Sequence, residues 1–256
     1  MAVMLEARAL GYGYPGRPVG RGLDLGLDAG EVLCVLGPNG GGKTTLFRTL
    51  LGLLPAQAGS VLLEGHALEG MPRGEVARRV GYVPQGHTAQ FAFTVREAVL
   101  MGRTAHISLF AAPGAADREA ADRAIAALGI ESLAGRVVTE LSGGERQLAV
   151  IARALAQGAR ALVLDEPTAS LDFGNQVRVL RQLVRLAAEG YAVVFSTHDP
   201  GQAFLAASRV LLIAHGGALR QGTPDEVITS ENLRAVYGVE VRVATVDGAR
   251  ACLPVL

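Results

Sequence analysis

The 256-residue sequence has little of what a membrane span, a disulfide framework or a nucleic-acid surface requires. Its apolar runs, of which Leu148–Leu155 is among the longest, are far shorter than the ~18 residues that cross a bilayer. Cys34 and Cys252 are its only cysteines, which excludes a disulfide framework and favours a reduced, cytosolic setting. Met1–Leu10 contains no apolar signal segment, so we expect no secretory leader. Lys+Arg and Asp+Glu number 24 each, and this zero formal net charge disfavours nucleic acid as a partner.

Lysine and aromatic residues are also scarce. Lys43 is the only lysine among 24 basic residues, and aromatic residues make up 5% of the chain. Because arginine serves at every other basic position, we infer that position 43 requires a compact ammonium rather than a planar guanidinium. Half of the residues are hydrophobic, and the mean hydropathy of +0.30 fits buried strands together with a docking surface. For a chain of this length we expect residues 1–256 to form a single domain with lobes.

The hydrophobic pattern predicts an α/β fold. Continuous apolar runs are typical of parallel strands that are covered on both faces. Four such runs are Val32–Leu36, Ala161–Leu164, Ala192–Ser196 and Val210–Ile213. Near the N-terminus, Leu23, Leu25 and Leu27 alternate with polar or glycine neighbours, which instead predicts a half-buried antiparallel strand. We therefore expect a mainly parallel sheet core with an N-terminal antiparallel β part.

Helical patterns lie between the strands. One apolar stripe at spacings of three and four predicts a helix; it consists of Phe173, Val177, Leu180, Val184 and Ala187. Helices are also expected at Thr94–Met101 and Asp117–Leu128, in a stretch that has no clear strand pattern. We therefore expect a helical lobe of residues 86–157, inserted into a core lobe of residues 1–85 and 158–256.

A glycine-rich pattern follows the first buried strand. It reads Gly37-Pro38-Asn39-Gly40-Gly41-Gly42-Lys43-Thr44 and fits the phosphate-loop pattern G-x-x-x-x-G-K-[ST]. It follows the strand Val32–Leu36 and precedes a helix expected at Thr45–Leu51, as a phosphate loop requires. Glycines allow successive backbone N–H groups to surround phosphate oxygens at a helix N-terminus. We expect Lys43 to bridge the outer phosphates, Thr44 to ligate Mg²⁺, and Thr45 to lie beside them.

Two carboxylates end another apolar strand. Asp165 and Glu166 directly follow Ala161–Leu164, so this strand delivers them to the carboxyl edge of the sheet, where ligands bind. We expect Asp165 to hold Mg²⁺ through water, as the acidic partner of a phosphate loop does. Glu166 would then point to the γ-phosphate and polarise the attacking water. Solvated charges at a strand end are the plainer interpretation, and the upstream phosphate loop argues against it.

The segment 141–147 resembles the signature of the ABC ATPase family; it reads Leu141-Ser142-Gly143-Gly144-Glu145-Arg146-Gln147. The resemblance implies a P-loop NTPase of the ABC cassette type that binds and hydrolyses ATP with Mg²⁺. It also implies a head-to-tail homodimer, in which Ser142, Gly143 and Gly144 cover the γ-phosphate bound by the partner's phosphate loop. Capping of the following helix explains Ser142 alone, but not the whole segment.

Other elements of the ABC family follow in order along the chain. The resemblance implies that Gln85 contacts Mg²⁺ and links the core to the helical lobe, and that His198 senses the γ-phosphate. Ser170-Leu171-Asp172 resembles the loop that crosses the dimer interface, which places Asp172 beside the nucleotide. Tyr14 resembles the aromatic residue that stacks on adenine, and Tyr12 is a rival for that role.

The middle and the C-terminal part indicate a subtype. Segments 93–97, 101–106, 222–227, 231–233 and 236–238 resemble the ATPases of metal-chelate importers, which take up iron–siderophore, haem or cobalamin. The stretch 102–113 also resembles molybdate- and tungstate-type relatives. An exporter cassette is not excluded by motif. A soluble ABC ATPase of DNA repair or translation is a further alternative, although no long coiled coil separates the phosphate loop from the signature.

Importer resemblance also implies partners and a location. The chain would lie at the cytoplasmic face of the cell membrane as a peripheral subunit, docked on integral membrane permease subunits. A substrate-binding protein would be an indirect partner, which acts through these permease subunits. We expect the docking surface at the loop after Gln85 and at Phe91–His106, including Phe91 and Phe93. Within this surface we expect Arg96 and Arg103 to contact the permease.

Overall fold

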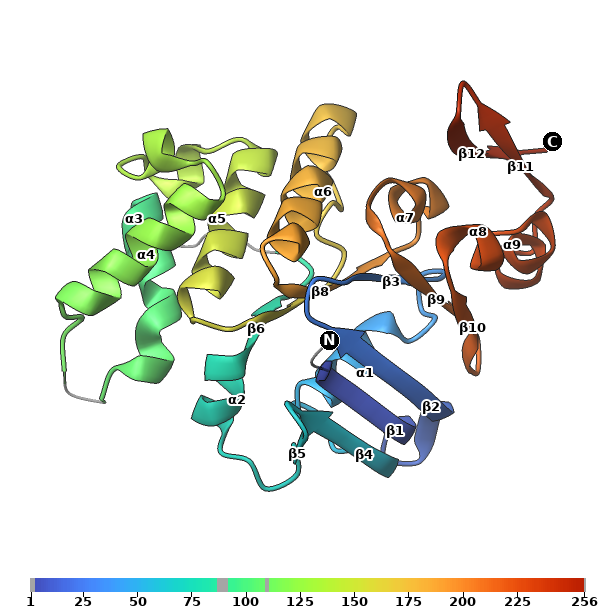
Figure 1. Cartoon of the computed structure of the whole chain (residues 1–256), viewed down its shortest axis with the longest axis horizontal. Coiled ribbons are helices and arrows are strands. Elements are labelled where there is room, and N and C mark those ends of the chain that lie inside the picture. The colour runs from blue at the N-terminus through green and yellow to red at the C-terminus, as the bar shows by residue number, and fades with distance from the viewer. Residues whose placement is uncertain (1–2, 87–91, 109–110, 256) are drawn as a thin grey trace.

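The computed structural model describes residues 3–86, 92–108 and 111–255, and its ribbon is shown in Figure 1. A six-stranded sheet with the order β10-β9-β3-β8-β7-β6 lies at its centre. The parallel strands are β3 (Val32–Leu36), β6 (Val80–Val83), β7 (Ala161–Leu164), β8 (Ala192–Thr197) and β9 (Arg209–Ala214). β10 (Gly217–Gly222) pairs antiparallel with β9 at one edge. The four apolar runs predicted to be buried strands are confirmed.

A smaller antiparallel sheet is formed by strands from the first 67 residues. Its order is β2-β1-β4-β5, formed by β1 (Val3–Tyr14), β2 (Arg17–Asp28), β4 (Ala58–Leu63) and β5 (His66–Ala67). The three alternating leucines of β2, Leu23, Leu25 and Leu27, are buried, as their pattern predicts. A C-terminal hairpin of β11 (Val241–Val246) and β12 (Ala249–Pro254) forms a third sheet among the described residues.

Helices cover the central sheet and also form a group of their own. They are α1 (Lys43–Leu50), α2 (Arg73–Arg79), α3 (Val95–Leu100), α4 (Ala115–Ala127), α5 (Gly143–Ala156), α6 (Phe173–Ala188), α7 (Pro200–Ala206), α8 (Pro224–Val227) and α9 (Ser230–Tyr237). α3, α4 and α5 pack against one another beside the sheet (Figure 1). The helices expected at Thr94–Met101 and Asp117–Leu128 are confirmed as α3 and α4. Within the ranges that the structure describes, no helix is both long and apolar enough to cross a membrane.

The central sheet separates two hydrophobic layers, because alternate residues of each strand face opposite sides. Cys34 and Leu36 of β3 face a layer that includes α5, α6 and α7. Leu33 and Val35 of the same strand face a layer that includes α1 and the antiparallel sheet. Figure 1 shows this arrangement, with α6 and α7 on one side of β3 and β8 and with α1, β1 and β2 on the other. The loops at the carboxyl ends of the parallel strands carry the site described below.

The predicted apolar stripe of α6 is wrong in its membership, although the helix itself is confirmed. Phe173 is 80% exposed, and Val184 is also exposed. The buried face consists of Val179, Leu180, Leu183, Leu186 and Ala187. The buried stripe is rotated by about 80° around the helix axis from the predicted one. The two stripes share only Leu180 and Ala187. The pattern therefore predicted the helix correctly but not which of its faces is buried.

Arg103 does not lie free on a docking surface, which corrects the expectation for this residue. Its side chain is 14% exposed and forms an ion pair with Asp117 at 3.0 Å. It also donates a hydrogen bond to the backbone carbonyl of Ala156 at 2.9 Å. Arg103 therefore ties α4 and α5 together. Arg96 is exposed as expected and pairs with Asp122 at 2.8 Å, whereas Phe91 lies outside the described residues.

Candidate functional site

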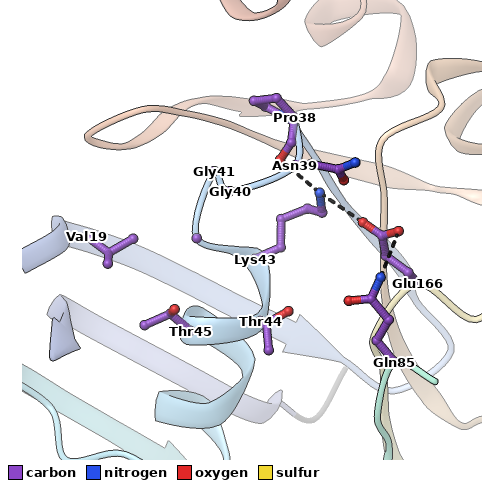
Figure 2. A pocket seen from close by; sticks show the side chains of 11 residues that line it. Val19, Pro38, Asn39, Gly40, Gly41, Lys43, Thr44, Thr45, Gln85 and Glu166 are labelled. Carbon is purple, nitrogen blue, oxygen red and sulfur yellow. Dashed lines mark hydrogen bonds and ion pairs between the residues drawn. The ribbon is translucent and has the colours of Figure 1, made fainter. Parts of the chain in front are cut away.

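A cavity of about 420 Å³ lies at the carboxyl end of β3, above the loop that joins β3 to α1. Figure 2 shows its lining side chains, with Lys43, Glu166 and Gln85 pointing toward one another. The lining consists of Val19, Pro38, Asn39, Gly40, Gly41, Gly42, Lys43, Thr44, Thr45, Gln85 and Glu166. The structure thus brings most of the predicted phosphate loop, the predicted Mg²⁺ ligands Thr44 and Gln85, and the predicted general base into one cavity.

Glycines shape the loop between β3 and α1. Gly40 and Gly42 have φ angles of 77° and 97°, a region that favours glycine because a Cβ is strained there. A Cβ at Gly37 would collide with the backbone carbonyl of Ile213 on β9. These positions let the chain turn sharply and lead backbone N–H groups to the start of α1, where the helix dipole favours an anion.

Lys43 uses its ammonium group as three separate donors. The side chain is buried, and Nζ donates to the carbonyl oxygens of Gly37 at 2.8 Å and Pro38 at 3.0 Å. The third contact is an ion pair with Glu166 Oε1 at 3.1 Å. An ammonium has three N–H groups that point in three directions, whereas a guanidinium is planar and larger. The contacts therefore give a physical reason for the only lysine of the chain.

Asp165 directly follows β7 and is not part of the cavity lining. It is 1% exposed, and its Oδ1 accepts a 2.6 Å hydrogen bond from Ser196 Oγ on the adjacent strand β8. Its Oδ2 is buried and has no hydrogen-bond partner among the described residues. A buried carboxylate oxygen without a partner is costly unless a cation or water satisfies it. Asp165 therefore fits the predicted role of holding Mg²⁺.

Glu166 has an unusual backbone and a crowded carboxylate. Its φ angle is 47°, a left-handed conformation that is rare for residues other than glycine, and its N–H donates to Ser196 Oγ at 2.8 Å. Its Oε2 lies 3.4 Å from Gln85 Nε2 and 3.3 Å from His198 Nδ1. Backbone strain of this kind is typical of functional sites, where surrounding contacts hold it.

The predicted signature and interface residues lie elsewhere. Ser142 caps α5, because its Oγ accepts from the N–H of Glu145 and its own N–H donates to the Glu145 carboxylate. Asp172 caps α6 by accepting from the N–H of Asn175 at 2.9 Å. Ser142, Gly143, Gly144 and Asp172 are not part of the cavity lining. Their predicted place at the nucleotide of a second copy stays a prediction.

The two tyrosines that compete for the adenine differ sharply in exposure. Tyr12 is 0% exposed, and its ring packs beneath Gly20 and Gly42, so it presents no face to a ligand. Tyr14 is 40% exposed, and its hydroxyl accepts a 3.3 Å hydrogen bond from Arg48. Only Tyr14 of the pair is available for stacking, and its contact with adenine stays a prediction.

Sequence reasoning missed three residues at or near this site. Val19 lines the cavity, Ser196 bonds to both Asp165 and Glu166, and Tyr237 donates to the carbonyl of His198 at 3.0 Å. Ser196 carried a signal, because it is a polar residue in a strand otherwise predicted to be buried and apolar. Val19 carried none, and Tyr237 lies in a segment noted only for its resemblance to importer ATPases, since tertiary packing alone brings both to the loop.

Comparison with known proteins identifies the family. The family profile described as ABC transporter matches residues 21–169, which is more than half of the chain. The chain belongs to the ABC transporter family. It is the ATP-binding, ATP-hydrolysing cassette of that family, which confirms the resemblance seen in the sequence and the predicted fold class.

Two relatives and a solved structure cover nearly the whole ABC cassette. The hemin import ATP-binding protein HmuV of Nocardia farcinica is 42% identical over 260 residues, which span 99% of this chain and 90% of that protein. The ferric enterobactin transport ATP-binding protein FepC of Escherichia coli is 39% identical and covers 92% and 87%. A solved ABC transporter of the metal-chelate type, in an inward-facing conformation, has a TM-score of 0.86 and 35% identity, with 99% and 98% coverage.

Proposed function

We propose that this ABC ATPase drives an importer of metal chelates of the iron–siderophore, haem or cobalamin class. The hydrolytic role rests on one observation: the Glu166 carboxylate is held at the mouth of the phosphate loop by Lys43 and two further polar side chains. The substrate class is supported by relatives named for import of haemin and transport of ferric enterobactin.

Hydrolysis would begin with an exchange of partners at Lys43. Its ammonium lies 3.1 Å from Glu166 Oε1, so the two charges neutralise each other. ATP in the phosphate loop places its outer phosphates within reach of the same ammonium. Glu166 then becomes free to accept a proton from the attacking water, a role that contributes on the order of 10²–10⁴-fold. His198, 3.3 Å from Glu166, would orient the carboxylate and contact the γ-phosphate.

The donor set of the site fits Mg²⁺. The chain offers the Thr44 hydroxyl, the Gln85 amide and the Asp165 carboxylate, and hard divalent cations prefer such oxygen ligands. Because Ser196 holds Oδ1 of Asp165, the unpartnered Oδ2 is the oxygen left for the ion or its bound water. Bound there, Mg²⁺ would neutralise charge on the outer phosphates of ATP.

Two copies of the chain would form the complete site, head to tail. Ser142, Gly143 and Gly144 form the N-terminus of α5, outside the cavity lining, and so would meet the nucleotide of the other copy. Phe173, directly after the predicted interface loop, is 80% exposed. An exposed aromatic side chain of this kind is typical of an interface.

A second cavity supports docking of a membrane subunit. Its volume is about 290 Å³, and its lining is mostly apolar: Leu51, Gly52, Leu53, Leu68, Met71, Arg73, Val76, Ala77, Val80, Tyr82 and Gln157. These residues come from the end of α1, from the connection between β5 and α2, and from α2 and β6, with Gln157 from the end of α5. The cavity therefore lies among α1, α2 and β6 and reaches the end of the helical group. Phe93 and Met101 on and beside α3 are exposed apolar residues. We propose that the chain lies at the cytoplasmic face of the membrane, docked on permease subunits. A substrate-binding protein would deliver the substrate to these permease subunits.

The Glu166→Gln variant tests the hydrolytic proposal. Glutamine keeps the size of the side chain but cannot accept the proton, so MgATP binding should persist while hydrolysis falls about 10²–10⁴-fold. An ATP-bound pair of chains should accumulate. The matched control is Glu189→Gln at the exposed end of α6, which should hydrolyse normally. A Glu166→Gln protein with the wild-type rate would exclude the general-base role.

Uptake assays test the importer proposal. Cells that lack this chain should lose uptake of one class among a ferric siderophore, haem and cobalamin, and the wild-type chain should restore it. The Glu166→Gln variant should not restore it. Normal uptake of all three classes in the deletion strain would contradict the proposed substrate class while leaving the ATPase role intact.

A further inference from the structure

Tyr237, the last residue of α9, contacts the loop that carries His198. Its hydroxyl donates a 3.0 Å hydrogen bond to the backbone carbonyl of His198. The imidazole of His198 in turn lies 3.3 Å from the carboxylate of Glu166. A side chain from the C-terminal part of the chain therefore fixes the backbone of a residue that touches the proposed general base.

The surroundings of Tyr237 keep its hydroxyl in the donor form. The side chain is half-buried against the same hydrophobic layer as Cys252 of β12. This burial raises the pKa of Tyr237 well above its usual range, and the nearby carboxylates Asp199 and Glu166 act in the same direction. The phenol therefore keeps its proton at neutral pH and can donate it to the carbonyl oxygen of His198.

The C-terminal hairpin is fastened to the helix that follows His198. Arg250 of β12 forms an ion pair with Asp225 at 2.9 Å. Its guanidinium also lies 5.7 Å from the ring centroid of Phe204 on α7, within the range of a cation–π contact. α7 begins at Pro200, and its cap Asp199 is the residue directly after His198. The hairpin thus contacts α7, and Tyr237 contacts the loop between β8 and α7.

We propose that Tyr237 is a positioning residue for ATP hydrolysis and that it acts through His198. The inference rests on the proposed role of His198 at Glu166. Without the phenolic O–H, the His198 carbonyl loses its donor from α9, and the loop is free to turn the imidazole away from the carboxylate. The contacts of Lys43 and the phosphate loop are unaffected, so the loss should fall on kcat and not on KM for ATP.

The Tyr237→Phe variant removes the hydroxyl and keeps the ring. In the full-length chain we expect kcat to fall about three- to tenfold, the value of one hydrogen bond, with KM for ATP unchanged within about twofold. Tyr191→Phe is the matched control, because Tyr191 is also half-buried and lies at the opposite end of β8. Thermal melting of both variants measures any general loss of packing.

A double-mutant cycle decides whether the effect passes through His198. Hydrolysis is measured in single turnovers, with protein in excess over MgATP, for Tyr237→Phe, His198→Ala and the combination. We expect Tyr237→Phe to have no further effect once His198 is alanine. An equal loss in both backgrounds, a normal kcat in Tyr237→Phe, or the same loss in Tyr191→Phe would each overturn the inference and leave the proposed function intact. A normal rate in His198→Ala would instead remove the role of His198 itself, and the inference with it.

Discussion

Ser196 Oγ bonds to both members of the carboxylate pair: it donates to Asp165 Oδ1 at 2.6 Å and accepts from the N–H of Glu166 at 2.8 Å. One fully buried hydroxyl therefore holds the proposed Mg²⁺ ligand and also the strained backbone of the proposed general base. The hydroxyl group can do both because it is donor and acceptor at once.

Replacing Ser196 by alanine should impair catalysis more than stability alone explains. The change leaves a buried carboxylate oxygen and a backbone N–H without a partner, which costs about 1–3 kcal/mol, and we expect kcat to fall at least about tenfold. Ser208→Ala is the control, because the Ser208 hydroxyl also makes two hydrogen bonds, both to the backbone of Val32, far from the carboxylates. Steady-state hydrolysis and thermal melting should show both variants destabilised and only Ser196→Ala slow. Equal rates in the two variants would contradict this.

Lys43 should tolerate no replacement, including arginine. Its three contacts, to two carbonyl oxygens and to Glu166, fit the geometry of an ammonium, and a guanidinium is too large for the same enclosure. We expect Lys43→Arg to lose hydrolysis nearly as fully as Lys43→Ala, although it retains the charge. ATP binding and hydrolysis measured for both variants provide the check. Wild-type activity in Lys43→Arg would show that charge alone matters.

The sequence predicted what local patterns determine and missed what packing determines. The strands and the loop at residues 37–44 follow from apolar runs and glycine spacing, both of which act over a few residues. The buried face of α6 could not be predicted in this way, because the exposed Phe173 is apolar and aromatic like a core residue. Ser196 and Tyr237 reach their partners across 31 and 39 residues of sequence, so only the assembled sheet brings them to Asp165 and His198.

Phe173 should contribute to pairing of two copies. It is 80% exposed at the first position of α6, where an acidic residue is compatible with the helix dipole, so Phe173→Asp should fold normally. A charge in an apolar contact is costly, so ATP-dependent pairing should weaken about tenfold or more in a Glu166→Gln background. Analytical ultracentrifugation with and without MgATP measures this. Leu205→Asp on α7, where Leu205 is 62% exposed, is the control and should pair normally. Unchanged pairing of Phe173→Asp would place the interface elsewhere.

Docking on a membrane subunit should depend on Leu53 and Arg96 and not on the phosphate loop. Leu53 is 46% exposed and lines the apolar cavity between α1 and α2, while Arg96 is exposed on α3. An aspartate at position 53 puts a charge into this apolar cavity, and Arg96→Glu reverses a surface charge. Both variants should therefore fail to copurify with the proposed permease subunits. Basal ATP hydrolysis should stay within about twofold of the wild type, because neither residue lines the nucleotide cavity.

Leu219→Asp is the matched control: Leu219 is 49% exposed on β10, at the other edge of the sheet, and its replacement should leave docking intact. Retained copurification and uptake in both Leu53→Asp and Arg96→Glu would show that the docking surface lies elsewhere.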